Sequence, residues 1–175
     1  MAGPETPRPQ RAGSHSDVER TADGRYIVVG GRRWRASDPT IPEPLRTELV
    51  AELMRARRLV GVRGDEARPM VHDAKVALGE RGRPWWETPT DEADRERLAA
   101  AVRALLRQRD GSTICPSDAA RAVGGERWRH LMAPAREVAR ALREEGIVEL
   151  RQRGREVDEP AAGPLRIGPG PALRR

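Results

Sequence analysis

The chain has 175 residues, 33 basic and 27 acidic side chains, and a formal net charge of +6. Hydrophobic residues make up 37% of it, below the roughly 45–50% of an ordinary globular domain, so we expect small cores built from Leu, Val and Ala. One cysteine excludes an internal disulfide framework. The lack of a secretory signal, and of any apolar run near the ~18 residues of a membrane span, predicts a cytoplasmic protein with no membrane partner.

The first part of the chain predicts a tail followed by a hairpin. Residues 1–23 are rich in Pro, Gly, Ser and Arg and contain little that could pack, so we expect them to be disordered. β-Branched and aromatic residues at 25–29 precede Gly30-Gly31 and a second extended run at 32–35. Because glycine tolerates the positive φ of a two-residue turn, this pattern predicts a β-hairpin.

Two helices are predicted after the hairpin, and they complete an N-terminal module at residues 24–87. The first begins near Pro44 and ends at Gly61 and Gly64, with apolar residues mostly four apart, namely Leu45, Leu49, Leu53, Ala56 and Val60. The second covers about 70–78. We expect three tryptophans to pack against the first helix, with a stacking surface for a ligand or a base as the alternative. These are Trp34, Trp85 and Trp86.

The next segment predicts two capped helices. Thr90 is a good N-cap, and the helix after it turns Leu98, Val102, Leu105 and Leu106 inward. Residues 113–114 can form a short strand. Cys115 then caps a helix that begins at Pro116, with Asp118 placed to bond back to the cap amide and Gly124-Gly125 at its end.

The following elements predict a third helix and a wing. A helical turn at 126–131 leads to a helix from Pro134 to Glu145, which Gly146 stops. Residues 147–151 and 155–157 read as strands joined by an Arg153-Gly154 turn, and 164–167 can add an edge strand. The predicted fold class is α+β: a hairpin plus two helices, then a winged helix-turn-helix at residues 88–167. Residues 168–175 are expected to form a disordered tail.

Two groups of arginines make this predicted winged helix a candidate for binding double-stranded DNA. The third helix carries one group on a single face, and the wing carries the other. A helix in the major groove with a wing beside it would use both, because the planar guanidinium fork pairs well with guanine and phosphate. The candidate residues are Arg136, Arg140, Arg143, Arg151, Arg153 and Arg155.

A protein-interaction module is the alternative function. Acidic residues lie beside both basic groups, namely Glu137, Glu144, Glu149 and Glu156. Arginine is so common in this chain that an exposed arginine stripe is expected on many helices. Winged helices serve both uses, and the fold by itself does not decide between them.

No catalytic, metal or cofactor site can be assembled from the sequence. Cys115 stands at a helix N-terminus, where a thiol can be activated, but a space-filling cap is the simpler interpretation. His72, Asp73 and Lys75 lie together on a predicted helix, but His72 and Asp73 are adjacent, so they point in different directions and cannot form a two-ligand site. No zinc spacing involves His15 or His130. Ser112 and Ser117 have no histidine base nearby in sequence. We therefore predict a non-enzymatic protein without a cofactor, with an RNA-modifying enzyme as a remote alternative.

Both halves of the chain resemble uncharacterised bacterial proteins. The strings Thr113–Asp118, Ala120–Gly125, Trp128, Leu131-Met132, Val138, Gly146, Gly154, Val157-Asp158 and Gly163–Arg166 resemble the family known as domain of unknown function 3253, over residues 91–167. The resemblance implies a winged-helix-like fold, and no activity or functional residue comes with it. Residues 23–87 resemble a small actinobacterial protein often labelled as the biopolymer transporter Tol, through Gly24–Val29, Gly31–Ala36, Glu48–Val50 with Glu52–Met54, Val71–Gly82 and Pro84–Trp86. No feature of these strings supports transport.

Overall fold

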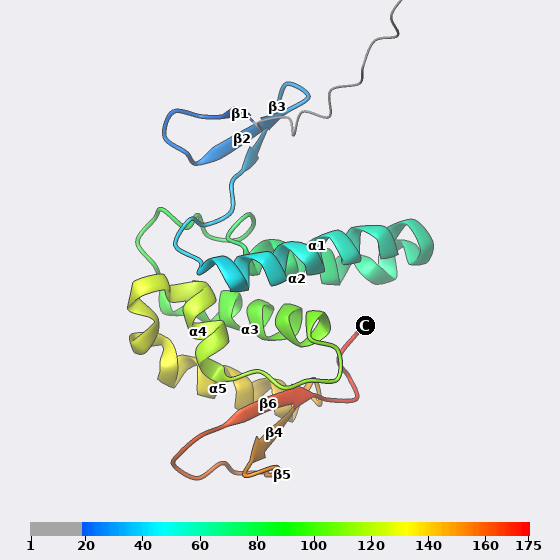
Figure 1. Cartoon of the computed structure of the whole chain (residues 1–175), viewed down its shortest axis with the longest axis vertical. Coiled ribbons are helices and arrows are strands. Elements are labelled where there is room, and N and C mark those ends of the chain that lie inside the picture. Colours follow the sequence, from blue (N-terminus) through cyan, green and yellow to red (C-terminus); the bar gives the residue numbers. More distant parts are fainter. Residues whose placement is uncertain (1–18) are drawn as a thin grey trace, which may run out of the picture.

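The computed structural model describes residues 19–175 and has an α+β fold. A small sheet lies at one end, a layer of helices forms the middle, and a second small sheet lies at the other end (Figure 1). Most of the predicted N-terminal tail, residues 1–18, lies outside the described residues. Within residues 19–175, no helix combines the length and the apolar character needed to cross a bilayer.

The first sheet contains β1 (Glu19–Arg20), β2 (Tyr26–Val29) and β3 (Arg32–Arg35), in the order β1-β2-β3 and antiparallel throughout. The predicted hairpin is confirmed, and its turn uses Gly30 and Gly31 at φ values of 58° and 74°. The predicted tail extended too far, because β1 pairs with β2 and the Tyr26 amide donates to the Thr21 hydroxyl at 3.1 Å. Residues 19–23, which were assigned to the tail, are therefore ordered against β2.

Two antiparallel helices follow the hairpin. They are α1 (Glu43–Arg63) and α2 (Arg68–Ala77), joined by the 3₁₀ turn η1 (Gly64–Ala67). The predicted apolar stripe of α1 is buried from Leu45 to Ala56. The helix continues through Gly61 and ends before Gly64, whose φ of 59° ends the helical conformation.

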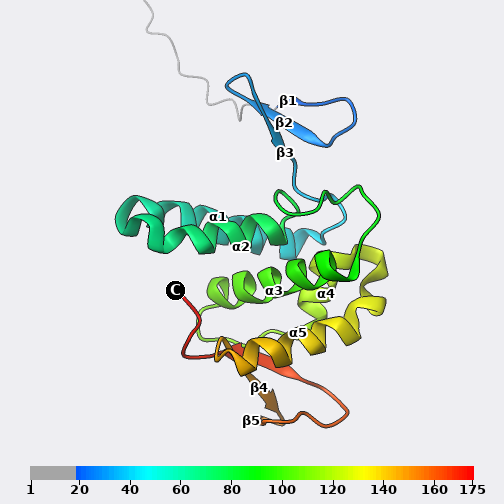
Figure 2. The same cartoon turned by 180° about the vertical axis from the view of Figure 1, so that it is seen from behind.

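The central helix of the molecule is α3 (Asp91–Gln108). Thr90 caps it as predicted, since its hydroxyl accepts the Ala93 amide at 3.3 Å. α3 contacts α1 and α2 on one side and α4 and α5 on the other (Figures 1 and 2). Small residues make this possible, because Ala100, Ala101 and Ala104 are all buried.

One main hydrophobic core results, where the composition suggested two small ones. It runs from Leu49 of α1 through Leu105 of α3 to Ile167 near the C-terminus. Only a minor cluster at the far end of α1 and α2, built on Ala56, Ala67 and Met70, is separate. Residues on both sides of the boundary predicted at 87–88 contribute to this core.

The C-terminal half follows the predicted order. It contains α4 (Pro116–Gly124), the 3₁₀ segment η2 (Gly125–Leu131), α5 (Met132–Glu144), β4 (Val148–Gln152), β5 (Arg155–Glu156) and β6 (Arg166–Pro169). The three strands pair in the order β5-β4-β6, and Ile114 forms an isolated bridge with Ile167. α5 begins two residues earlier than predicted, because Pro134 still falls in the first turn, where its missing amide is tolerated.

The local signals of this half are confirmed. The Cys115 amide donates to Oδ2 of Asp118 at 3.1 Å, as expected for the cap of α4. Arg153 and Gly154 form the predicted turn between β4 and β5 with φ values of 50° and 79°. Such a turn matches the twist of the strands that it joins.

The C-terminal segment was predicted to be a disordered tail, and this is wrong. Gly168 and Pro169 belong to β6, and Leu173 is only 6% exposed within the main core. The Ala172 amide donates to the Gly146 carbonyl at 3.0 Å. A Cβ on Gly170 would lie 2.4 Å from that carbonyl oxygen, so only glycine allows the chain to pass this close.

The tryptophans were predicted to pack in the N-terminal core, and this is wrong for Trp34, which is 44% exposed on β3. Trp85 and Trp86 are partly buried where the hairpin joins the helices. Trp85 Nε1 donates to the Ala36 carbonyl at 3.0 Å, and the Trp86 ring lies 5.5 Å from the Tyr26 ring. These rings attach the hairpin to the helical layer.

Candidate functional site

The predicted basic face of α5 is partly occupied by the loop between β5 and β6. Arg136 Nη2 donates to the Gly163 carbonyl at 2.7 Å, and Arg143 pairs with the Asp158 carboxylate. Arg140 lies between them along the helix, is exposed, and forms no side-chain hydrogen bond or ion pair within residues 19–175. On this face, two guanidiniums hold the loop and one remains available to a ligand.

Strand register separates the three candidate arginines of β4, β5 and the turn between them. Arg151 pairs with Glu156 and Arg166, whereas Gln152 pairs with Arg155. Paired residues share a face of the sheet, and neighbours along a strand point to opposite faces. Arg155 is therefore on the face that carries buried Leu150 and packs on α5, and Arg151 is on the outer face.

On the outer face, the carboxylate of Glu149 pairs with Arg151. The Nη2 atom of Arg151 lies 2.9 Å from Oε2 of Glu149 on the same strand. Arg153, at the tip of the turn, and Arg155 are both exposed, and within the described part of the chain neither has a side-chain partner. Of the six predicted contact residues, the structure thus leaves Arg140, Arg153 and Arg155 unengaged.

Two acidic residues on or near α5 form ion pairs with arginines. Glu137 pairs with Arg95 of α3 at 3.3 Å, and Asp158 pairs with Arg143. The carboxylates of Glu137 and Asp158 are therefore each paired with a guanidinium other than that of Arg140. This arrangement leaves the positive charge of Arg140 uncompensated by an ion pair.

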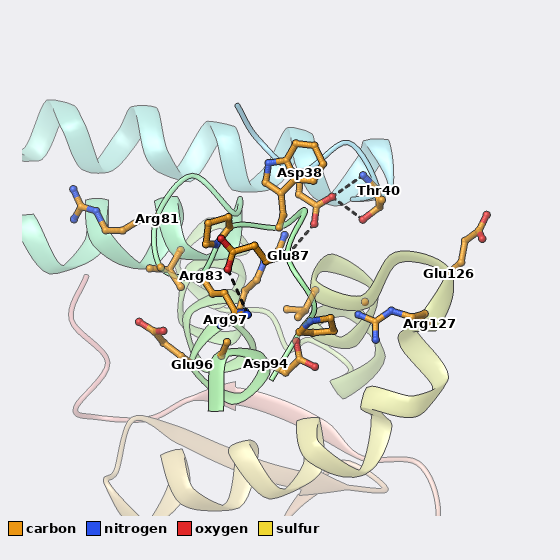
Figure 3. A pocket seen from close by; sticks show the side chains of 18 residues that line it. Asp38, Thr40, Arg81, Arg83, Glu87, Asp94, Glu96, Arg97, Glu126 and Arg127 are labelled. Carbon is orange, nitrogen blue, oxygen red and sulfur yellow. Dashed lines mark hydrogen bonds and ion pairs between the residues drawn. The ribbon is translucent and has the colours of Figure 1, made fainter. Parts of the chain in front are cut away.

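A hollow of about 420 Å³ lies at the N-terminal end of α3, and no sequence pattern predicted it. Residues 38–40, the loop 81–89, the first turns of α3 and the α4–η2 junction line it (Figure 3). Asp38 accepts the Thr40 amide at 2.9 Å and pairs with Arg97 at 2.8 Å, as the dashed lines in Figure 3 show. These partners come from segments far apart in sequence, so only the weak Asp-Pro-Thr turn signal could have indicated the hollow.

Charges of both signs line this hollow, and two ion pairs join some of them. Arg83 pairs with Glu87 at 3.4 Å, beside the pair of Asp38 and Arg97. Burial raises the pKa of Asp94 above its usual value, while the nearby Arg127 and Arg97 lower it. A pocket with this balance selects no particular ligand charge.

The reactive groups weighed in the sequence have structural partners. Asp118, which accepts the Cys115 amide, also pairs with Arg109 at 2.8 Å, so the start of α4 already has a carboxylate. His72 Nδ1 lies 3.1 Å from Arg81 Nη1, whereas neighbouring Asp73 is buried among arginines of α3. Within residues 19–175, no cluster of His, Cys, Asp and Glu has the arrangement needed to hold a metal ion.

Comparison with known proteins places only the C-terminal half. Residues 95–169 match the family described as "Protein of unknown function (DUF3253)". No curated protein matches the chain. The resemblance of residues 23–87 to an actinobacterial protein stays a prediction. The C-terminal half of this chain, from within α3 to the end of β6, is therefore similar to a family whose function is unknown, as the sequence indicated.

Proposed function

We propose that this protein binds double-stranded DNA through its C-terminal half, acting as a winged helix. The order of α3, the Ile114 bridge, α4, α5, β4, β5 and β6 supports this interpretation, as does the pairing of β6 with both β4 and Ile114. In helix-turn-helix proteins the recognition helix enters the major groove. Here that helix is α5, and the turn between β4 and β5 is the wing.

One observation carries the proposal: Arg140 on α5 and Arg153 and Arg155 on the wing are exposed and unengaged within the described residues. Arg140 would read base edges, because its fork can pair with guanine. Arg153 and Arg155 would contact phosphates, where each neutralised phosphate releases counterions. Arg136 and Arg143 then hold the loop between β5 and β6 against α5.

A mobility-shift titration of the full chain over a salt series tests the proposal. The logarithm of affinity should fall by about 0.9 for each log unit of salt and each phosphate neutralised. The double variant R153A/R155A should reduce that slope by about 2, because two phosphate contacts are lost. R151A is the matched control and should change the slope little, since Arg151 is on the outer face and paired.

Two outcomes would overturn the proposal. The first is no binding of duplex by the wild-type chain at low salt. The second is a salt slope that R151A lowers as much as R153A/R155A does. Either result would mean that the wing tip does not face a polyanion.

A protein-interaction role is the second candidate, because Gly163 and Asp158 already occupy part of the α5 face. Val62, at the far end of α1, is also 83% exposed, which is unusual for a large aliphatic side chain. Co-purification of one stoichiometric partner with the wild-type chain, lost in V62D, would favour this role. A chain that purifies alone and monodisperse would count against it.

A further inference from the structure

The β1–β3 sheet projects from the helical layer, and its two faces differ (Figures 1 and 2). The register pairs Tyr26 with Arg35 and Ile27 with Trp34, so these pairs point to opposite faces. The Tyr26 face receives Trp86, whose ring also lies beneath the Arg35 guanidinium at 5.6 Å. The Tyr26 face is thus the one that docks on the body.

The other face, formed by Ile27, Val29, Arg32 and Trp34, is called the Trp34 face below. Val29 is 52% exposed and Trp34 is 44% exposed. The chain has only five aromatic side chains other than histidine, and Trp34 is the most exposed of them within residues 19–175. An aromatic ring left open on a projecting hairpin is a surface on which a flat group can stack.

Cations surround this ring. The Arg32 guanidinium lies 5.6 Å from the centre of the Trp34 ring, and Lys75 Nζ, from α2, lies 5.3 Å from it. Burial is the main cause that lowers the pKa of Lys75, and the positive charges of Arg57 and Arg81 add to it. Within the described residues, none of Arg32, Arg57, Lys75 and Arg81 forms an ion pair with a carboxylate.

Little negative charge opposes these cations. Glu80 favours the charged form of Lys75, but its Oε1 atom also accepts the Ser37 hydroxyl at 2.9 Å. Asp23, in the turn between β1 and β2, already pairs with Arg25. The two cations over the Trp34 ring repel one another, and an anion bound beside them would relieve that repulsion.

We propose that the Trp34 face, together with Lys75, binds single-stranded nucleic acid. A base stacks on Trp34 and displaces the exposed Arg32 guanidinium, which then contacts the adjacent phosphate with Lys75. Stacked aromatic rings beside a positive groove are the means by which proteins hold single strands without reading their sequence. A duplex cannot use Trp34 in this way, because its bases are stacked on one another.

An anionic membrane surface is the competing partner for a basic face with apolar residues. The positions of the cations favour nucleic acid. Lys75 and Arg32 lie over the ring itself, so Trp34 cannot enter the acyl region without taking charged groups with it. A single strand offers a flat base and a phosphate a few ångströms apart, which matches the ring and its cations.

The test uses the full chain and a short fluorescently labelled thymidine oligonucleotide, measured by anisotropy at low salt. Trp34→Ala should weaken binding about 5- to 150-fold, the range for loss of one stacked base. Trp34→Phe should restore most of that affinity, because phenylalanine keeps a stacking face. Val62→Ala, an exposed aliphatic truncation far from the hairpin, is the matched control, and thermal melting checks that all variants fold.

The outcomes separate this inference from the proposed duplex binding, since the two use different residues. R153A/R155A should leave the affinity for the oligonucleotide unchanged, and Trp34→Ala should leave the affinity for duplex unchanged. Equal oligonucleotide affinity of wild type and Trp34→Ala would overturn the inference. So would a wild-type chain that ignores the oligonucleotide and binds phosphatidylserine–phosphatidylcholine vesicles instead.

Discussion

Arg107 of α3 donates from Nη2 to Oδ2 of Asp73 on α2 at 2.8 Å, although the two residues were predicted to lie in different modules. Their side chains are only 2% and 7% exposed. Asp73 also accepts Arg103 Nη2 at 2.8 Å, and Arg107 Nε donates to the Arg174 carbonyl at 2.7 Å. One carboxylate thus joins the N-terminal helices, the central helix and, through Arg107, the C-terminus.

Replacing Asp73 should destabilise the protein strongly. In Asp73→Ala the Arg107 guanidinium stays buried without its anion, and loss of one partner of a buried pair costs about 3–5 kcal/mol. Urea unfolding measures the change in the free energy of unfolding. Asp65→Ala, which breaks an exposed pair with Arg68, is the control and should cost less than about 1 kcal/mol. Equal losses in the two variants would contradict the proposed role of Asp73.

Leu173 tests whether the C-terminal segment belongs to the core. Truncating this buried side chain in Leu173→Ala should lower the free energy of unfolding by about 2–5 kcal/mol, the usual range for buried leucine. Val62→Ala removes exposed aliphatic surface and should change it by less than about 0.5 kcal/mol. A melting temperature that Leu173→Ala leaves unchanged would mean that the segment does not pack in solution.

Lys75 should make stability depend on pH in a defined direction. Burial, the largest cause, lowers the pKa of Lys75, and Arg57 and Arg81 lower it further. The folded state therefore releases this proton at lower pH than the unfolded chain does. The unfavourable contribution is fully present below the folded pKa and is relieved as pH rises toward the unfolded value of 10.5.

The variant Lys75→Met isolates this effect. It should unfold at higher urea than the wild type at pH 7, and its advantage should shrink as the pH is raised toward 10. Subtracting the wild-type curve from the variant curve removes the other titrating groups that both chains share. An advantage that grows with pH would contradict the assigned sign.

Replacing Asp158 tests whether the exposed face of α5 contacts duplex DNA. Asp158→Asn removes the carboxylate that pairs with Arg143, which frees a guanidinium beside Arg140 and removes repulsion toward phosphate. Duplex affinity should rise several-fold at low salt, and the salt slope should steepen by about 1. Asp65→Asn, remote from α5, controls for the change in net charge. If both variants have the same effect, α5 does not face the duplex.

Local sequence signals predicted most of the elements. Thr90, the pair of Cys115 and Asp118, and the Arg153-Gly154 turn act within a few residues, so their patterns can be recognised without knowing the fold. The Gly-Gly turn of the first hairpin belongs to the same class. The resemblance of the C-terminal half to a family of unknown function also depends on short strings of residues.

Features that depend on distant contacts could not be predicted in this way. The core position of Leu173 depends on Gly170 passing against the Gly146 carbonyl, and the exposure of Trp34 depends on which hairpin face docks. The separation of Arg151 from Arg155 follows from strand register, which the sequence leaves open. The loop on α5 was missed because the sequence does not show where Gly163 and Asp158 return to the helix.

The buried alanines of α3 limit which substitutions the contact between α3 and α2 can accept. Arg103 and Arg107 reach Asp73 on α2, and Ala100 and Ala104, which lie on the same side of the helix, are fully or almost fully buried. A bulkier residue at either position would push the two halves apart and pull the guanidiniums away from their shared carboxylate. The N-terminal half therefore cannot be exchanged freely for another domain. A replacement would need both a flat surface that packs on α3 and an acidic residue at the matching turn of its second helix.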